Sequence, residues 1–427
     1  MDSPYGAIKT TAVPCSHAER LPVNHNSTRR APLWAIGWMT FLFFVWGFLT
    51  EMDGALIPFL KDLFTLNNFQ AALVQFAFFL AFFLFSFPSA KLLAFMGFRK
   101  GIAIGLGIMA LGSFGFMLAG ASMQYGWFLL AIFTLAGGVT LLQVAANPYM
   151  VLLGGDDKGS HHLNIAQGFN ALAKVLAPLF GAWAILKGME VLAQEARIDR
   201  LNQVYFWIGL VLAILAIAFW RVPLPPVQAE RAEEANGGQR YRDFPHLLKG
   251  ALAIFFYVGA EVSVATFMVL YLGEVAEMTR AQGAIFLSYY WAALMSGRLL
   301  VPFIFPRLPA QKVLALFAFL AALCMTLAAK GAAWSAYTLV AAGFFHSIMW
   351  GNIFALSLKG LGGFTSKGSG LLVMAIVGGA FLPPLQGLVA DAINLPLSYL
   401  TLLPAYAYIF WYGLKGHQNK RNHAVTP

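Results

Sequence analysis

Two acidic residues lie inside the first long apolar segment of the chain. Residues 41–58 read FLFFVWGFLTEMDGALIP, and the only charged side chains in this stretch are Glu51 and Asp53. A charged side chain at the depth of a lipid bilayer costs about 2.5–3.5 kcal/mol on insertion scales, so two in one segment indicate a function. A carboxyl group can bind and release a proton or another cation. We interpret Glu51 and Asp53 as candidates for cation exchange, with a structural ion pair or a solvated helix end as the alternative.

A second group of polar residues recurs at helical spacing in the apolar segment 164–187. Gln167, Asn170 and Lys174 are spaced i, i+3, i+7, which places two amides and an ammonium group on one stripe of a helix. Amides both donate and accept hydrogen bonds, so such a stripe suits a ligand rich in hydroxyl groups. Lys174 is also a natural partner for Asp53 or Glu51. The alternatives are hydrogen bonds between helices for the amides and a purely structural ion pair for Lys174.

Further candidates for ligand contact are polar or aromatic side chains in other apolar segments: Gln143, Asn147, Glu261, His346, Trp350 and Asn352. Gln143 and Asn147 are spaced i, i+4 and share a helix face. His346 and Trp350 have the same spacing, and an aromatic ring can stack on the apolar face of a pyranose. A buried histidine is also common as a structural residue, and amides often join neighbouring helices. Both interpretations therefore stay open for this group.

The composition places these residues in a membrane protein. Hydrophobic residues make up 59% of the chain and charged residues 11%, whereas a soluble domain carries about 25% charged residues. Runs of about 20 apolar residues cross a bilayer as helices, because lipid offers no partner to the backbone. We predict an all-α integral membrane protein with twelve such helices, at approximately 34–59, 69–95, 101–121, 125–153, 164–187, 204–222, 247–273, 281–304, 311–329, 334–358, 367–391 and 397–414.

The basic residues predict how these helices are oriented. With the N-terminus inside, 21 of the 28 lysines and arginines fall in the segments on the cytoplasmic side, which are the tails, the loops and the adjoining helix ends. This asymmetry follows the positive-inside rule and places both termini in the cytoplasm. The net charge of +10 is therefore a consequence of topology, and we expect no nucleic-acid partner.

A polar stretch divides the predicted helices into two sets of six. It reads PLPPVQAERAEEANGGQRYRDFP and is too polar to cross a membrane. We predict a disordered cytoplasmic tail at 1–33, an N-terminal six-helix bundle at 34–222, a cytoplasmic linker at 223–246, a C-terminal six-helix bundle at 247–414 and a short tail at 415–427. We find no phosphate-binding loop, nucleophile elbow or convincing metal-ligand cluster, so we expect neither an enzyme nor a cofactor or metal.

Several stretches resemble one family of membrane transporters. GFLTEMDGALIPFLK, LLQVAANPYMVLLG, LNIAQGFNALAKVLAPLFG, YVGAEVSVATFMVLYL and the segment from GFFHSIMWGN to LQGLVAD resemble the fucose and glucose/galactose permease branch of the major facilitator superfamily. The resemblance implies two six-helix bundles around a central cavity, alternating access, and sugar uptake driven by a cation, usually the proton. It also places Gln167 and Asn170 in the substrate site.

The chain departs from this family at two acidic positions. Many members carry an Asn-Asp pair in the first span; here Gly54 occupies the position of the acid and Asp53 that of the amide. The fucose branch has an acid in the fourth span, where this chain has Gln143, as glucose/galactose-like members do. The second departure argues against fucose as the substrate, and the first leaves either first-span acid as the coupling group.

These observations lead to one functional hypothesis with stated alternatives. We expect a monomeric, multi-pass protein of the bacterial inner (plasma) membrane that imports a hexose such as glucose or galactose with a proton. The coupling residues would be Asp53, Glu51 and Lys174. The alternatives are a sodium-coupled sugar carrier, an N-acetylglucosamine carrier, a drug/proton exchanger and a non-transporting sugar sensor.

Overall fold

The structure of the chain is a computed structural model. It describes residues 32–52, 56, 59–60, 63–66, 68–186, 193–225, 239–278 and 280–418. Asp53 lies outside the described residues, as do most of the predicted N-terminal tail, the centre of the predicted linker and most of the predicted C-terminal tail.

All regular secondary structure in the described ranges is helical. The N-terminal half contains α1 (Leu33–Glu51), α3 (Asn68–Ser122), α4 (Tyr125–Gly181), the π-helical turn η1 (Ala182–Leu186) and α5 (Gln194–Arg221). The C-terminal half contains α7 (Pro245–Ala276), α8 (Arg280–Ile304), α9 (Ala310–Ala328), α10 (Ser335–His346), α11 (Met349–Leu358), α12 (Thr365–Met374), η5 (Ala375–Ala380), α13 (Leu382–Ala392), α14 (Leu395–Ser398) and α15 (Leu403–Trp411).

Two of these helices each combine two of the predicted spans. α3 is interrupted at Gly97 and α4 at Gly155, whose φ angles are 76° and 64°. Glycine adopts such positive φ values without the steric cost that a Cβ atom would bring, so each reverses the chain without a long loop. Eight helices among the described residues are long and apolar enough to cross a membrane, where α10 with α11 counts as one, and so does the segment from the 3₁₀ turn η4 (Gly362–Phe364) to α13. The membrane class is therefore supported, and the count of twelve stays a prediction.

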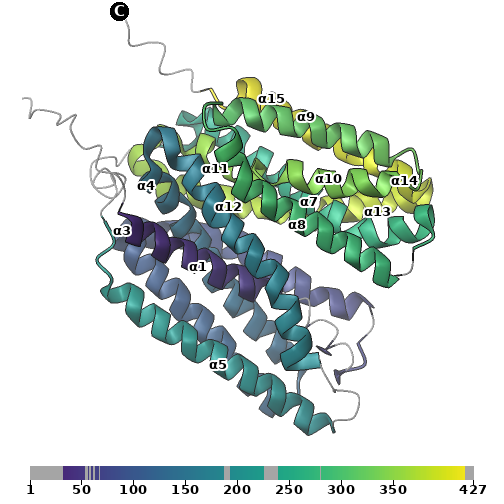
Figure 1. Ribbon diagram of the computed structural model, residues 1–427. Coiled ribbons are helices and arrows are strands. Elements are labelled where there is room, and N and C mark those ends of the chain that lie inside the picture. The colour runs from purple at the N-terminus through teal and green to yellow at the C-terminus, as the bar shows by residue number, and fades with distance from the viewer. Residues whose placement is uncertain are drawn as a thin grey trace, which may run out of the picture.

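The helices pack as two bundles. Figure 1 shows the purple-to-teal helices α1, α3, α4 and α5 together, and the green-to-yellow helices α7 to α15 as a second group beside them. In the first bundle, α3 packs against α4, α1 packs on α4, and α5 packs on α3. Many exposed side chains on the outer faces are apolar, including Leu111, Ile214 and Phe319. Such a surface matches a lipid environment.

The two bundles are joined near the end where α5 finishes and α7 begins, which we call the linker end. Asn164 of α4 donates from Nδ2 to Oδ1 of Asn352 in α11 at 2.9 Å, and Ser369 of α12 donates to the Val144 carbonyl at 2.8 Å. A Cβ atom at Gly370 would lie 2.7 Å from the Ala90 Cβ, so the backbones approach closely there. These contacts hold the linker end of the interface closed.

This close approach predicts the effect of one added methyl group. A Cβ at Gly351 would collide with the side-chain amide of Asn164, and overpacking of this kind costs about 1–3 kcal/mol. We expect Gly351→Ala to lower the apparent Tm of the purified protein. The matched control is Gly107→Ala, because a Cβ there meets nothing within 4 Å and alanine favours a helix. An unchanged Tm for Gly351→Ala would contradict the tight interface.

Candidate functional site

The predicted charged centre brings together the end of α1 and the part of α4 that follows Gly155. Lys174 Nζ of α4 lies 2.9 Å from Glu51 Oε1 at the end of α1, and the two side chains are 27% and 31% exposed. Lys174 Nζ is also 5.5 Å from the ring centroid of Trp291, which belongs to α8 of the other bundle. An ammonium group at this distance from an aromatic face is attracted by the ring. Lys174 therefore contacts an acid in its own bundle and an aromatic ring in the opposite bundle.

Most of the predicted amides of α4 are more buried than this ion pair, and two of them, Gln167 and Asn147, contact each other. Gln167 donates from Nε2 to Oδ1 of Asn147 at 3.3 Å, while no described residue accepts a hydrogen bond from the buried Asn147 Nδ2. Asn170 donates to the Phe43 carbonyl of α1 at 3.0 Å, which also gives it a structural contact. Gln143 is half-buried one helical turn before Asn147. A buried amide donor without a partner is costly, so Asn147 Nδ2 is a position that a hydroxyl oxygen could occupy.

Arg298 of α8 connects this amide group to the C-terminal bundle. Its Nη1 donates to the Gln167 carbonyl at 3.3 Å, and its Nε donates to the Ser347 carbonyl at 3.1 Å. Its Nη2 lies 3.6 Å from Glu261 Oε1, a distance that makes an ion pair rather than a hydrogen bond. The side chains are only 6% and 14% exposed. Glu261 thus neutralises the guanidinium while keeping capacity to accept hydrogen bonds.

His346 is the predicted site residue with the most fully satisfied side chain. It is completely buried; its Nδ1 is 2.8 Å from the Tyr290 hydroxyl and its Nε2 is 2.7 Å from the Tyr406 hydroxyl. α10 ends at His346, and α11 begins at Met349. The expectation that His346 and Trp350 share one face assumes an unbroken helix, and the structure has a break between them.

Trp350 and Asn352 lie on α11, on the linker side of this break. Trp350 is 6% exposed and stacks on Phe354 with 5.8 Å between ring centroids. Its indole Nε1 has no hydrogen-bond partner among the described residues, so it is a second buried donor that a ligand could use. The Asn352 side chain already has two hydrogen bonds: its Oδ1 accepts from Asn164, and its Nδ2 donates to the Ala310 carbonyl at 3.1 Å.

The sequence reasoning did not single out several residues of this region: Asn164, Tyr290, Trp291 and Tyr406. Asn164 precedes Gln167 by three residues, so the helical stripe that identified Gln167 could have been extended to it. The two tyrosines and Trp291 carry no such signal. They reach the site from helices whose packing partners the local spacing does not reveal.

Comparison with known proteins identifies the family. A model described as the Major Facilitator Superfamily matches residues 39–384. The chain belongs to the major facilitator superfamily. It is 39% identical over 417 residues to a Brucella abortus protein named glucose/galactose transporter, covering 94% of this chain and all of the relative. It is 31% identical over 394 residues to the Escherichia coli L-fucose-proton symporter, covering 86% and 90% of the two chains.

A solved structure supports the same assignment for the fold. The crystal structure of the facilitator-superfamily transporter FucP in its outward conformation matches with a TM-score of 0.81 and 28% identity, over 90% of this chain and 99% of that one. The chain is therefore an integral membrane protein of the major facilitator superfamily, located in the bacterial inner membrane, and its relatives are sugar transporters rather than enzymes. These findings confirm the resemblance identified from the sequence.

Proposed function

We propose that the chain imports a hexose, glucose or galactose, together with a proton. The observation that carries this proposal is that Lys174, paired with Glu51 of α1, lies on the same stripe of α4 as Gln167, whose partner Asn147 has a buried amide donor with no hydrogen-bond partner among the described residues. A titratable pair beside a group of neutral hydrogen-bonding side chains suits joint binding of a proton and an uncharged, hydroxyl-rich ligand. The Brucella abortus relative, a glucose/galactose transporter by name, supports the hexose, and the Escherichia coli relative, an L-fucose-proton symporter by name, supports the proton.

The moving parts in this proposal are the two bundles at residues 34–222 and 247–414, with twelve spans and cytoplasmic termini. Hydrogen bonds such as Asn164–Asn352 join the bundles at the linker end, and Glu51 and Lys174 keep side chains about one third exposed. We infer that sugar enters from the end opposite the linker and leaves after the linker end opens. The likeness to FucP in its outward conformation supports this direction.

The proposed coupling step is the binding and release of a proton by Glu51 in its ion pair with Lys174. Protonation of Glu51 would remove the negative charge that holds Lys174 and leave Lys174 facing Trp291 of the opposite bundle. Binding at one bundle would in this way be sensed by the other. Moving one charge through a potential of 100 mV provides about 2.3 kcal/mol, enough for about 50-fold accumulation of an uncharged sugar. Asp53 remains the second candidate for this acid.

The sugar site predicts a selective loss of affinity in Gln167→Ala. The variant removes one amide from the site and leaves Asn147 without its donor. Loss of such a hydrogen bond costs about 0.5–1.5 kcal/mol, or about 2- to 12-fold in Kd. Competition by glucose and galactose against a labelled sugar on the purified protein measures this change.

The matched control for this experiment is Gln194→Ala. Gln194 carries the same side chain at the start of α5, where its Nε2 donates to the Leu63 carbonyl at 3.5 Å. We expect wild-type sugar affinity in the control and micromolar to millimolar hexose binding in the parent. Equal affinities for parent and Gln167→Ala would assign Gln167 to helix packing alone. Failure of every monosaccharide and amino sugar to bind the parent would contradict the proposal that the protein transports a sugar.

A further inference from the structure

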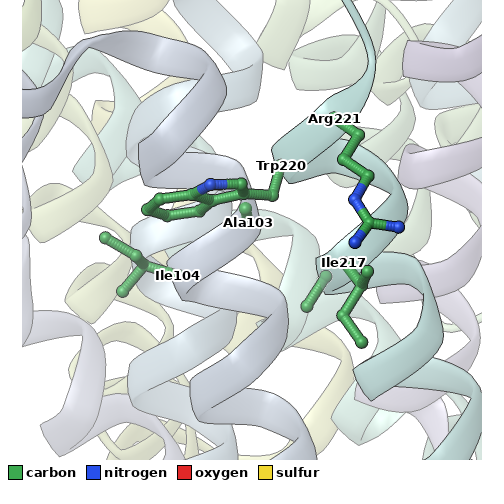
Figure 2. Close-up of a pocket in the computed structure, with 6 residues that line it drawn as sticks. Ala103, Ile104, Ile217, Trp220 and Arg221 are labelled. Atoms are coloured by element: carbon green, nitrogen blue, oxygen red, sulfur yellow. The ribbon is translucent and has the colours of Figure 1, made fainter.

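An apolar groove runs along the outside of the N-terminal bundle between α3 and α5. Its volume is about 280 Å³, and it is lined by Ala103, Ile104, Ala216, Ile217, Trp220 and Arg221. Figure 2 shows the Trp220 ring reaching from α5 towards the helix that carries Ala103 and Ile104, with the Arg221 side chain beside Ile217. The groove is far in sequence from the amides and the ion pair, and none of the site residues lines it.

The groove opens towards lipid rather than towards the other bundle. Ile214 and Ile217 on the outer face of α5 are 57% and 56% exposed, and the Trp220 ring is 47% exposed. Trp220 and Arg221 are the last two residues of this spanning helix. Tryptophan and arginine at the end of a spanning helix mark the level of the lipid headgroups. An occupant would therefore have an apolar part alongside Ala216 and Ile217 and a polar part at Arg221.

The charge at the headgroup end of the groove is positive. Arg221 is exposed, and the described residues give its guanidinium no carboxylate partner. Lys100 is exposed one helical turn before Ala103 and Ile104, so it lies at the same end of the wall formed by α3. A guanidinium group binds phosphate oxygens in a bidentate manner, and basic pockets between spanning helices bind anionic headgroups.

We propose that this groove is a binding site for one anionic phospholipid of the surrounding membrane. One acyl chain lies between α3 and α5 against Ala216 and Ile217, the Trp220 ring covers it, and the phosphate contacts Arg221 with Lys100 nearby. The ligand class follows from the combination of an apolar groove, a tryptophan at the headgroup level and a guanidinium that has no carboxylate partner among the described residues. A zwitterionic lipid would fit the same groove, but it would bind more weakly because it carries no net negative charge to pair with Arg221 and Lys100.

The test is native mass spectrometry of the full-length protein released from detergent with added phosphatidylglycerol or phosphatidylcholine. We expect one phosphatidylglycerol to bind in preference to phosphatidylcholine. A basic residue near the headgroups contributes about a five-fold factor in binding, so Arg221→Ala should weaken phosphatidylglycerol binding about five-fold. Ala216→Trp, which fills the groove, should weaken both lipids.

The matched control is Arg307→Ala, which removes an exposed arginine between α8 and α9 and should leave lipid binding unchanged. Excess inorganic phosphate should not displace the lipid, because the contact of the acyl chain with the groove contributes to binding and free phosphate lacks that contact. Equal binding of the two lipids, wild-type phosphatidylglycerol affinity in Arg221→Ala, equal losses in Arg221→Ala and Arg307→Ala, or displacement by free phosphate would each overturn the proposal. Gel filtration of every variant shows whether it is folded before lipid is added.

Discussion

Glu51→Gln is expected to abolish accumulation of sugar against a gradient while preserving exchange. Glutamine mimics the protonated carboxyl group, so the variant behaves as if a proton were always bound. Counterflow of sugar needs no net proton movement and should continue, whereas uphill transport requires the proton to leave. The physical basis is the pair between Glu51 Oε1 and Lys174 Nζ at 2.9 Å, which glutamine cannot reproduce as an ion pair.

Comparison of gradient-driven uptake with counterflow in the same proteoliposomes measures this separation. Glu195→Gln is the matched control, because Glu195 is an exposed acid in the first turn of α5 and should leave both activities intact. Asp53→Asn is measured in the same assays, because Asp53 is the other acidic residue of the first predicted span. If Glu51→Gln still concentrates sugar and Asp53→Asn does not, the coupling group is Asp53. If both variants concentrate sugar, the first helix does not carry the coupling, and Glu261 is the next acid to test.

Arg298→Ala is expected to produce the largest loss of stability among single substitutions in the site. It strands the Glu261 carboxylate, which is 14% exposed, and it removes the donors to the Ser347 and Gln167 carbonyls. Removing one partner of a buried ion pair costs about 3–5 kcal/mol. Arg298→Lys should also be impaired, because an ammonium group cannot reproduce the forked geometry that serves acceptors on different helices. Thermal denaturation of the purified variants tests both expectations.

The double variant Arg298→Met with Glu261→Leu separates stability from transport. Replacing a buried ion pair by apolar side chains of similar size is often neutral for stability, so the apparent Tm should recover towards the parent. Transport should not recover, because Arg298 donates across the bundle interface to the Gln167 carbonyl. Wild-type counterflow in the double variant would contradict a role for Arg298 at the interface.

The sequence was sufficient for the membrane class because lipid restricts the backbone to helices and leaves long apolar runs in the chain. It also identified Lys174 as a partner for a first-span acid, because a lysine in an apolar helix needs a compensating charge. The structure places Glu51 in that position, and Asp53 lies outside the described residues. The functional roles of the site residues stay predictions.

Other contacts and the breaks within helices depend on tertiary packing, which the spacing of residues along one segment does not reveal. His346 contacts Tyr290 and Tyr406, which are 56 and 60 residues away in the chain, so no helical periodicity could connect them. The segment 367–391 was predicted as one span, and it consists of α12, η5 and α13. The glycines and prolines of GGAFLPP in this segment are the local signal for such a break. The break between α10 and α11 falls at Ser347 and Ile348, and neither of these is a glycine or a proline that would have predicted it.

Uptake of labelled glucose and galactose into proteoliposomes, with an imposed proton gradient, tests the central claim most directly. With the outside more acidic than the inside, we predict that the reconstituted protein concentrates hexose above the external level, and that collapse of the proton gradient removes this accumulation while a sodium gradient does not restore it. Accumulation under a sodium gradient alone, or no uptake of any hexose under either gradient, would contradict the account.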